Sequence, residues 1–514
     1  MYEHWFVSRQ KRKLTTILPA LIAFSDICVG DVWSGNHELQ FKFEDELGNR
    51  SITEHGKLRA RRTGNGGGGI RTLFKQLKDL GLVFTEDDNG VCRLTLIGES
   101  LVKGDVTFVD GMRMQLQKYQ YPSATSCKGS GRISERFRIH PFQFMLRLLL
   151  DKRLNNTLYM NEMSNIVIHL ADSDNNKCFE EIVADVLYFR STGEYRRPVD
   201  PPKGDKLTYF NIANTFFNYI SLTQYVDRGT GCLILRDDRK KQVAEFVSEY
   251  SRFIGDPDCE ENYIRAYGRG NAAKDLRDFS EEKARTSQEL EEQRIRQEFV
   301  LLSLRKPIKR ITSDIVISIA NVTGISEIFV EKVLTVNYPH GNTSDFFTSY
   351  RELAHLGVSG AVEFEKATVE LFRSVFHMEA KHVGPIGNTP DVFVQSNESG
   401  FCGILDNKAY KDGYSVSGDH KRRMIDEYIP RYKDYGNTSY PLAFFSYIAG
   451  TFGANIDRQI RGIAEQTNVK GSAMPVDILI DFAEDYEAKN RTHEDVKKLF
   501  SVGRQVKLTD LETL

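Results

Sequence analysis

Hydrophobic residues recur at helical spacing in the first part of the chain. The apolar positions between 70 and 80 lie three and four residues apart, at Ile70, Leu73, Phe74, Leu77 and Leu80. Gly81 follows the last of them, which is typical of a helix end. Residues 82–98 (LVFTEDDNGVCRLTLIG) then predict two short strands around an Asn-Gly turn. We expect helices before this point from about residue 15, so that a helix followed at once by a hairpin predicts a winged helix-turn-helix.

A similar pattern recurs further along the chain. Three apolar-periodic segments, FRIHPFQFMLRLLLD, TLYMNEMSNIVIHL and CFEEIVADVLYF, precede a helix-like stretch, TYFNIANTFFNYISLTQYV, which leads into a turn and a strand. We predict two further helical, winged-helix-like units between about residues 138 and 250. Winged helices bind other proteins as well as DNA, so the pattern leaves both roles open.

The second half of the chain changes character twice. Residues 256–310 are rich in charge and poor in apolar positions, which favours a helical linker. Residues 311–514 alternate amphipathic helices with apolar strands, which predicts an α/β domain with a mixed central sheet. The predicted domains are therefore a winged-helix subdomain at 1–135, a second helical or winged-helix recognition subdomain at 136–255, the linker, and the α/β domain.

Composition narrows the class of protein. The chain has 514 residues, of which 40% are hydrophobic and 27% charged, as expected of a multidomain soluble globular protein. The seven cysteines are scattered singly, which favours a reducing cytoplasm. The net charge is only −2, but KLRARR at 57–62 is a dense basic cluster. Such a local cluster fits either one DNA-facing surface or an ordinary solvated face.

The chemistry concentrates in TPDVFVQSNESGFCGILDNKAY, residues 389–410. Asp391, Asp406 and Lys408 make the pattern P-D-x(14)-D-x-K next to two short apolar strands. Two carboxylates at neighbouring strand positions can hold one or two Mg²⁺ ions, which prefer oxygen ligands. Side chains alternate along a strand, so Asp406 and Lys408 are expected on one face, where the lysine could hold or help deprotonate an attacking water. Glu365, on a predicted helix at 359–376, could add a ligand or orient that water.

A simpler interpretation of the same residues is a salt bridge between Asp406 and Lys408 at the end of a strand. His377 and His382 lie near the pattern, and we interpret them as structural. The sequence contains no Ser-His-Asp order, zinc-spaced His/Cys set or H-E-x-x-H motif.

These residues carry a family resemblance. PDVFV and GILDNKAYKDGYSV resemble the cleavage domain of FokI-like and AlwI-type type IIS restriction endonucleases, which belong to the PD-(D/E)xK superfamily. The segments AKHVG, F-x-G-x(4)-Q and HEDVKKLF extend the likeness, and LQKYQYPS with IHPFQFMLRLLL resembles the recognition half of the AlwI-type enzymes. The second acid here is aspartate, whereas AlwI-type relatives can carry glutamate, so the subfamily stays open.

The resemblance implies that Asp391 and Asp406 are Mg²⁺ ligands and that Lys408 is the catalytic lysine. Glu365 falls where the AlwI-type enzymes have an acidic residue on a helix, and this correspondence is less specific. The resemblance also implies pairing through the helix HKRRMIDEYI. Arg423 and Glu427 on that helix could form reciprocal salt bridges in a homodimer, or they could form an ordinary pair one turn apart.

The sequence thus predicts a cytoplasmic bacterial enzyme that binds a short asymmetric duplex sequence and cuts DNA beside it. Five basic residues are the candidates for contact with DNA: Arg59, Arg61, Arg62, Arg71 and Lys75. The D-P-P-K at 200–203 lacks the features of a methyltransferase, so a separate DNA methyltransferase is the expected partner. Alternatives are a nicking enzyme, the large subunit of a heterodimeric enzyme, and a DNA-binding regulator with an inactive nuclease domain.

Overall fold

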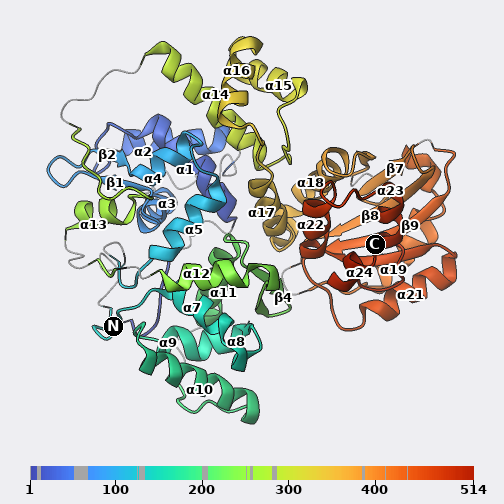
Figure 1. Cartoon of the computed structure of the whole chain (residues 1–514), viewed down its shortest axis with the longest axis horizontal. Coiled ribbons are helices and arrows are strands. Elements are labelled where there is room, and N and C mark those ends of the chain that lie inside the picture. Colours follow the sequence, from blue (N-terminus) through green and yellow to red (C-terminus); the bar gives the residue numbers. More distant parts are fainter. Residues whose placement is uncertain are drawn as a thin grey trace. The chain divides into compact units, whose positions relative to one another are not determined.

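The computed structural model divides the chain into two compact units (Figure 1). Unit 1 comprises Met1–Val300 and Ile317–Asn337, and unit 2 comprises Leu301–Val316 and Tyr338–Leu514. These divisions differ from the boundaries suggested by the sequence, which remain a prediction. The structure describes residues 2–8, 13–50, 52, 68–123, 126, 133–199, 207–249, 252–254, 259–279, 286–384, 388–410, 413–436 and 438–514.

The first part of unit 1 follows the order expected from its hydrophobic pattern. Helices α1 (Ile17–Ile27), α2 (His37–Asn49) and α3 (Gly68–Asp79) precede the antiparallel hairpin of β1 (Val83–Thr85) and β2 (Cys92–Leu94). All five apolar positions that predicted α3 are buried: Ile70, Leu73, Phe74, Leu77 and Leu80. Gly90 has a φ of +72°, which the turn between the strands requires and glycine adopts without strain. Val32, between α1 and α2, forms an isolated antiparallel bridge with Val91.

The next part of unit 1 contains a small sheet set among helices. After α4 (Leu96–Val102), α5 (Phe108–Lys118) and α7 (Pro141–Leu150), the chain forms β3 (Thr157–Tyr159), a helical stretch at 160–170 and α10 (Asn176–Thr192). Helix α11 (Leu207–Ser221) then leads into β4 (Val226–Gly229) and β5 (Cys232–Leu235), and the strand order is β3-β5-β4, all antiparallel. Helix α12 (Lys240–Ser248) and α13 (Glu260–Tyr267) follow.

The charged region at 256–310 is more deeply packed than its composition suggests. Helix α14 (Ser287–Ser303) buries Ile295, Phe299 and Val300, although polar residues occupy most of its length. The charged helix therefore has a buried apolar side, which the composition of the region did not suggest.

Unit 2 contains the mixed sheet expected from the sequence. Its five strands lie in the order β10-β9-β8-β7-β6: β10 (Lys470–Pro475), β9 (Leu442–Ala449), β8 (Phe401–Lys408), β7 (Val392–Ser396) and β6 (Glu379–His382). β8, β9 and β10 run parallel to one another, whereas β7 pairs antiparallel with both β6 and β8. Parallel strands need a crossover connection, and α21 (Ile456–Thr467) provides it between β9 and β10.

Helices cover both faces of this sheet (Figure 1). One face packs on α17 (Ser344–Leu353), α18 (Ala361–Ser374), α22 (Val476–Asp485) and α23 (His493–Phe500). The other packs on α21 and on the helical segment formed by α19 (Gly418–Arg423) and the π-helical turn η7 (Met424–Tyr428). The predicted helix HKRRMIDEYI thus contains a π-helical turn from Met424, and α20 (Tyr432–Gly436) follows it.

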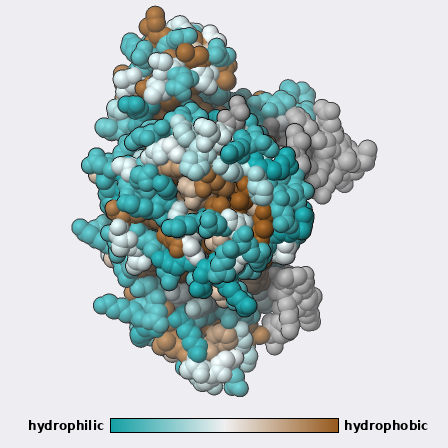
Figure 2. All heavy atoms as spheres, turned by 90° about the vertical axis from the view of Figure 1, so that its right-hand side faces the viewer, coloured by the Kyte–Doolittle hydropathy of each residue, from teal (hydrophilic) through white to brown (hydrophobic). Residues whose placement is uncertain are grey.

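The face in Figure 2 is mostly hydrophilic, with hydrophobic residues gathered near its centre. The helix pair α15 (Ser313–Thr323) and α16 (Glu327–Asn337) exposes several apolar side chains: Ile317, Val322, Ile328 and Val336. Within the described residues no single helix has the length and hydrophobicity to cross a bilayer, although this pair, bent by 117°, passes the same criterion when its two helices are joined.

Candidate active site

The register of two strands places the acids of the sequence pattern side by side. Val392 of β7 lies opposite Leu405 of β8, so Asp391, just before β7, comes next to Asp406. The backbone N–H of Asn407 donates a hydrogen bond of 2.7 Å to Oδ2 of Asp391. The fourteen intervening residues form the rest of the hairpin and its turn, which explains the spacing of the two acids.

Lys408 lies on the same face of β8 as Asp406, as the alternation of side chains predicts. Its Nζ is 2.8 Å from Oδ2 of Asp406, and both side chains are largely buried. Burial alone would lower the pKa of Lys408, but the carboxylates of Asp406 and Asp391 outweigh it and raise the pKa to about 12. The salt bridge that the sequence offered as an alternative is therefore present, at the position where a catalytic lysine was expected.

The environment of Asp391 disfavours the charged form of its carboxyl group. Burial raises the pKa of its carboxyl well above the ordinary value, and the negative charges of Asp406 and Glu365 raise it further, while Lys408 opposes them. Acids held this close to one another are common at functional sites, where a cation or substrate completes the charge balance.

Glu365 reaches the same site from helix α18. Its side chain is buried, and its Oε2 lies 2.7 Å from Nε2 of His382 on β6. The structure therefore brings all four candidates together, Asp391, Asp406, Lys408 and Glu365, and their roles in catalysis remain proposals. His382 contacts Glu365, which its sequence position alone did not reveal.

The opposite face of β8 anchors the strand end. The side chain of Asn407 donates a hydrogen bond of 2.6 Å to Oγ1 of Thr368 on α18, and Thr368 in turn lies 2.8 Å from the hydroxyl of Tyr350 on α17. All three residues are buried. This chain of contacts fixes the residue whose N–H holds Asp391, and no motif in the sequence indicated it.

Aromatic residues line the acidic face of the sheet. Burial raises the pKa of Tyr414, of Tyr447 and of Tyr428, and the Asp406 carboxylate raises each of them further. Nδ1 of His420 lies 2.9 Å from the hydroxyl of Tyr414. Tyr414 belongs to the D-N-K-A-Y-x-x-G-Y run of the sequence, whereas His420 and Tyr428 carried no recognisable signal.

The donor set suits a hard divalent cation. Asp391 and Asp406 offer carboxylate oxygens, and their mutual repulsion is what such a cation would relieve. Among the described residues, no group of three or more His, Cys, Asp and Glu side chains is arranged to enclose a metal ion. Two carboxylates with open positions for water and phosphate are what Mg²⁺ sites commonly provide.

The candidate DNA-binding residues are only partly described. Arg59, Arg61 and Arg62 lie outside the described residues, as does the segment 200–203. Arg71 is exposed and Lys75 is half-buried, and both belong to α3.

The candidate dimerisation residues have partners within the chain. Nη2 of Arg423 lies 2.8 Å from Asp419, and Oε1 of Glu427 lies 2.7 Å from Nη1 of Arg422. The exposed pairs therefore join Arg423 to Asp419 and Glu427 to Arg422, and dimerisation itself stays a prediction.

Comparison with known proteins agrees with this geometry. Residues 324–507 match the family described as FokI, cleavage domain, and the match includes the β7–β8 hairpin with its two acids and lysine. The acids and the lysine thus lie in a region that is similar to the FokI cleavage domain. Residues 110–221, ahead of the cleavage domain, match the family described as the N-terminal domain of the type II restriction endonuclease HgaI. The chain therefore resembles type II restriction endonucleases in both halves.

Individual relatives are more distant. The type II restriction enzyme StsI of Streptococcus sanguinis is 26% identical over 146 residues, which cover 26% of this chain and 24% of StsI. The chain thus aligns with about a quarter of the length of this curated relative.

Three solved structures align with low scores. Restriction endonuclease FokI, which aligns over 98% of this chain and 99% of its own, has 12% identity and a TM-score of 0.31. FokI bound to DNA gives the same identity and score over 98% and 93% of the two chains. The BpuJ1 endonuclease binding domain, in complex with pyrene- and phenanthrene-modified DNA, has 14% identity and a TM-score of 0.39 over 52% of this chain and 96% of that one. Scores of this size do not establish a common fold.

Proposed function

We propose that this chain is a type IIS restriction endonuclease. It would bind a short asymmetric sequence in double-stranded DNA and hydrolyse phosphodiester bonds at a fixed distance outside that sequence. The observation that carries the proposal is the buried cluster of Asp391, Asp406 and Lys408 in a FokI-type cleavage domain. The match of residues 110–221 to the HgaI N-terminal domain supports a recognition function for the other half.

Asp391 and Asp406 would hold Mg²⁺. When bound, the ion lowers the pKa of an attacking water and neutralises charge that develops on the phosphate. Lys408 would place its ammonium group beside that phosphate and help to position the water. Glu365, held by His382, would orient the water from the side of α18. Hydrolysis would leave a 5′-phosphate and a 3′-hydroxyl.

Unit 1 would recognise DNA through winged helices. The bridge of Val32 with Val91 adds a third short β-segment to the β1–β2 hairpin, in the helix and strand order of a winged helix. In the order β3-β5-β4, a strand ahead of the helices likewise pairs with the second strand of a hairpin, here the one that follows α11. Helix α3 would then enter the major groove and present Arg71 and Lys75.

The same proposal implies partners for this chain. A double-strand break needs two catalytic sites, so two cleavage domains would pair transiently, with Arg423 and Glu427 exchanging their internal partners for those of a second copy. A small partner subunit would serve the same purpose. A separate methyltransferase would protect the host DNA, and the enzyme would act in the bacterial cytoplasm.

Incubation of the purified protein with supercoiled plasmid and Mg²⁺ tests the proposal. Linear product supports double-strand cleavage, and run-off sequencing of that product gives the site and the offset. Open circles that persist would instead identify a nicking enzyme or one subunit of a heterodimer. Supercoiled plasmid that survives with Mg²⁺ and with Mn²⁺ would contradict the proposal and favour a DNA-binding regulator.

A further inference from the structure

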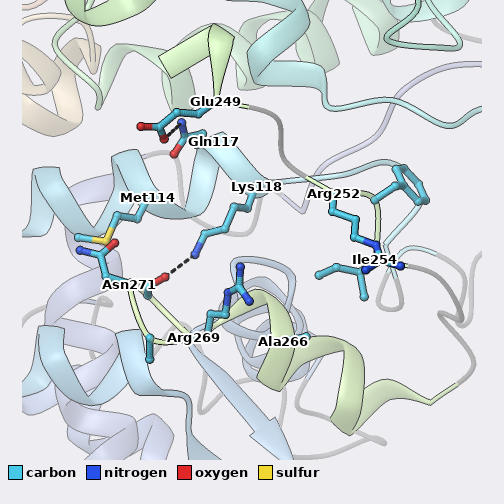
Figure 3. Close-up of a pocket in the computed structure, with 12 residues that line it drawn as sticks. Met114, Gln117, Lys118, Glu249, Arg252, Ile254, Ala266, Arg269 and Asn271 are labelled. Atoms are coloured by element: carbon cyan, nitrogen blue, oxygen red, sulfur yellow. Dashed lines mark hydrogen bonds between the residues drawn. The ribbon is translucent and has the colours of Figure 1, made fainter. Parts of the chain in front are cut away.

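Unit 1 contains a cavity that has no part in the cleavage chemistry. It has a volume of about 600 Å³ and lies between α5, the segment that follows α12 and the segment that follows α13. Figure 3 shows Lys118, Arg252 and Arg269 around it, one from each of these three segments. Helix α5 and two segments more than 130 residues further along the chain thus bring three cationic side chains to one cavity.

These three cations lack acidic partners within the described part of the chain. Lys118 Nζ donates a hydrogen bond of 3.0 Å to the backbone carbonyl of Gly270, and Arg269 donates one of 2.9 Å to the carbonyl of Ala273. Many of the described arginines of unit 1 pair with acids, as Arg153 does with both Asp151 and Glu180. Positive charge at the cavity is therefore left for a ligand to balance.

The position of Lys118 in the cavity disfavours its charged form. Burial lowers the pKa of its ammonium group to about 8, and the nearby Arg269 contributes to the decrease. A partly buried ammonium beside a guanidinium, whose hydrogen-bond partner in the described structure is a neutral carbonyl, would be stabilised by an anion that entered the cavity. Gly270 has a φ of +60°, so the backbone turn that aims its carbonyl at Lys118 suits glycine.

One acid, Glu249, also lines the cavity. Nε2 of Gln117 donates a hydrogen bond of 2.9 Å to its carboxylate (Figure 3) and one of 3.0 Å to the carbonyl of Phe246. Glu249 is thus held by a neutral amide, and no ion pair joins it to the three cations in the described residues. Three positive charges against one negative charge leave the cavity cationic.

We propose that this cavity binds a backbone phosphate of the DNA duplex, with Lys118, Arg252 and Arg269 as its ligands. The inference rests on the proposed function and assigns a contact that the basic cluster at 57–62 did not suggest. A cavity of about 600 Å³ is large enough for a phosphate group. Because phosphate carries no base identity, the contact would fix the position of the DNA and leave the choice of sequence to other residues.

Fluorescence anisotropy with a labelled duplex, in Ca²⁺ to prevent cutting, tests the proposal on the full chain. Lys118→Met removes the charge and keeps the length of the side chain, whereas Lys118→Arg keeps the charge. We expect Lys118→Met to weaken binding about tenfold and to reduce the slope of log affinity against log salt by about 0.9, the value for one phosphate contact. Lys118→Arg should keep most of both. Lys489→Gln, an exposed lysine of unit 2 that pairs with Asp485, is the matched loss of one charge and should leave the slope unchanged.

Other outcomes would overturn the inference. If Lys118→Met binds DNA with the affinity and salt slope of the wild type, the cavity does not hold a phosphate of the duplex. If inorganic phosphate raises the melting temperature of the wild type but not of Lys118→Met, while DNA binding is the same, the ligand is a free phosphate. Arg252→Gln, at an exposed position, repeats the measurement should Lys118→Met fail to fold. A wild type that binds and cuts no DNA would instead refute the proposed function.

Discussion

The backbone N–H of Asn407 holds Oδ2 of Asp391 at 2.7 Å, while its side chain holds Thr368 at 2.6 Å on the other face of the sheet. One residue therefore connects the acidic site to the helical layer behind it. The position of Asp391 depends on that layer as well as on its own strand.

The first prediction concerns the link through Thr368. Thr368→Val removes the hydroxyl and leaves the Asn407 amide buried without its acceptor, so we expect a loss of about 1–3 kcal/mol in the free energy of unfolding. The cleavage rate should also fall, while affinity for DNA stays the same. Urea denaturation and single-turnover cleavage measure the two effects. Thr368→Ser keeps the hydroxyl and should keep the rate; equal losses in both variants would show that the hydrogen bond does not matter.

The second prediction concerns Lys408. Lys408→Ala should lower the cleavage rate by about three orders of magnitude, in line with the loss of a group that positions a nucleophile or transfers a proton. DNA affinity in Ca²⁺ should change little. Plasmid cleavage and anisotropy are the measurements, and Lys366→Ala, an exposed lysine of α18, is the control. A loss of binding as large as the loss of cutting would contradict the assignment of recognition and cleavage to different parts of the chain.

The third prediction concerns the charge of Asp391. Asp391→Asn retains an oxygen that can accept the Asn407 hydrogen bond but removes a carboxylate that repels Asp406 and Glu365. Without metal, the variant should therefore be more stable than the wild type, by about 1–2 kcal/mol. Mg²⁺ should raise the melting temperature of the wild type and not of the variant. A wild type that melts at the same temperature with and without Mg²⁺ would argue against the metal site.

The fourth prediction concerns the pH dependence of stability in unit 1. Burial, with a smaller effect from His4, lowers the pKa of His169 from 6.5 to about 4. Between these values the unfolded chain binds a proton that the folded chain does not, so stability falls as pH decreases from 6.5 to 4. The loss at pH 4 should be on the order of 2 kcal/mol for this residue. Urea unfolding at several pH values should show a shallower decrease in His169→Gln; the same decrease in both proteins would refute the assignment.

Several elements of this structure could be predicted because the pattern of neighbouring residues determines them. The α3 periodicity and the Asn-Gly turn specify a helix and a hairpin by short-range physics, and the alternation of side chains along β8 places Asp406 beside Lys408. The two edge strands of the sheet were harder to predict from the sequence. β6 (EAKH) is polar and shows no alternation of apolar residues, and β10 (KGSAMP) contains glycine and proline.

The remaining contacts depend on tertiary packing. Nothing in the spacing of Asn407 and Thr368 indicates that they meet, since the sheet and α18 must first be assembled. For the same reason, the sequence suggested a pair between Arg423 and Glu427, whereas the π-helical turn that begins at Met424 redirects each side chain to a different partner. The cations of the cavity come from three segments that no sequence pattern connects.

The path of the chain through the two units has a practical consequence for anyone who wants to transplant the cleavage domain. Segment 301–316 belongs to unit 2, where Ile308 exchanges two backbone hydrogen bonds with Asn342 and Lys309 pairs with Glu487 at 3.1 Å. A fusion that begins at residue 324, the start of the family match, would discard these contacts. A fusion that keeps these contacts should begin near residue 301, ahead of the family match.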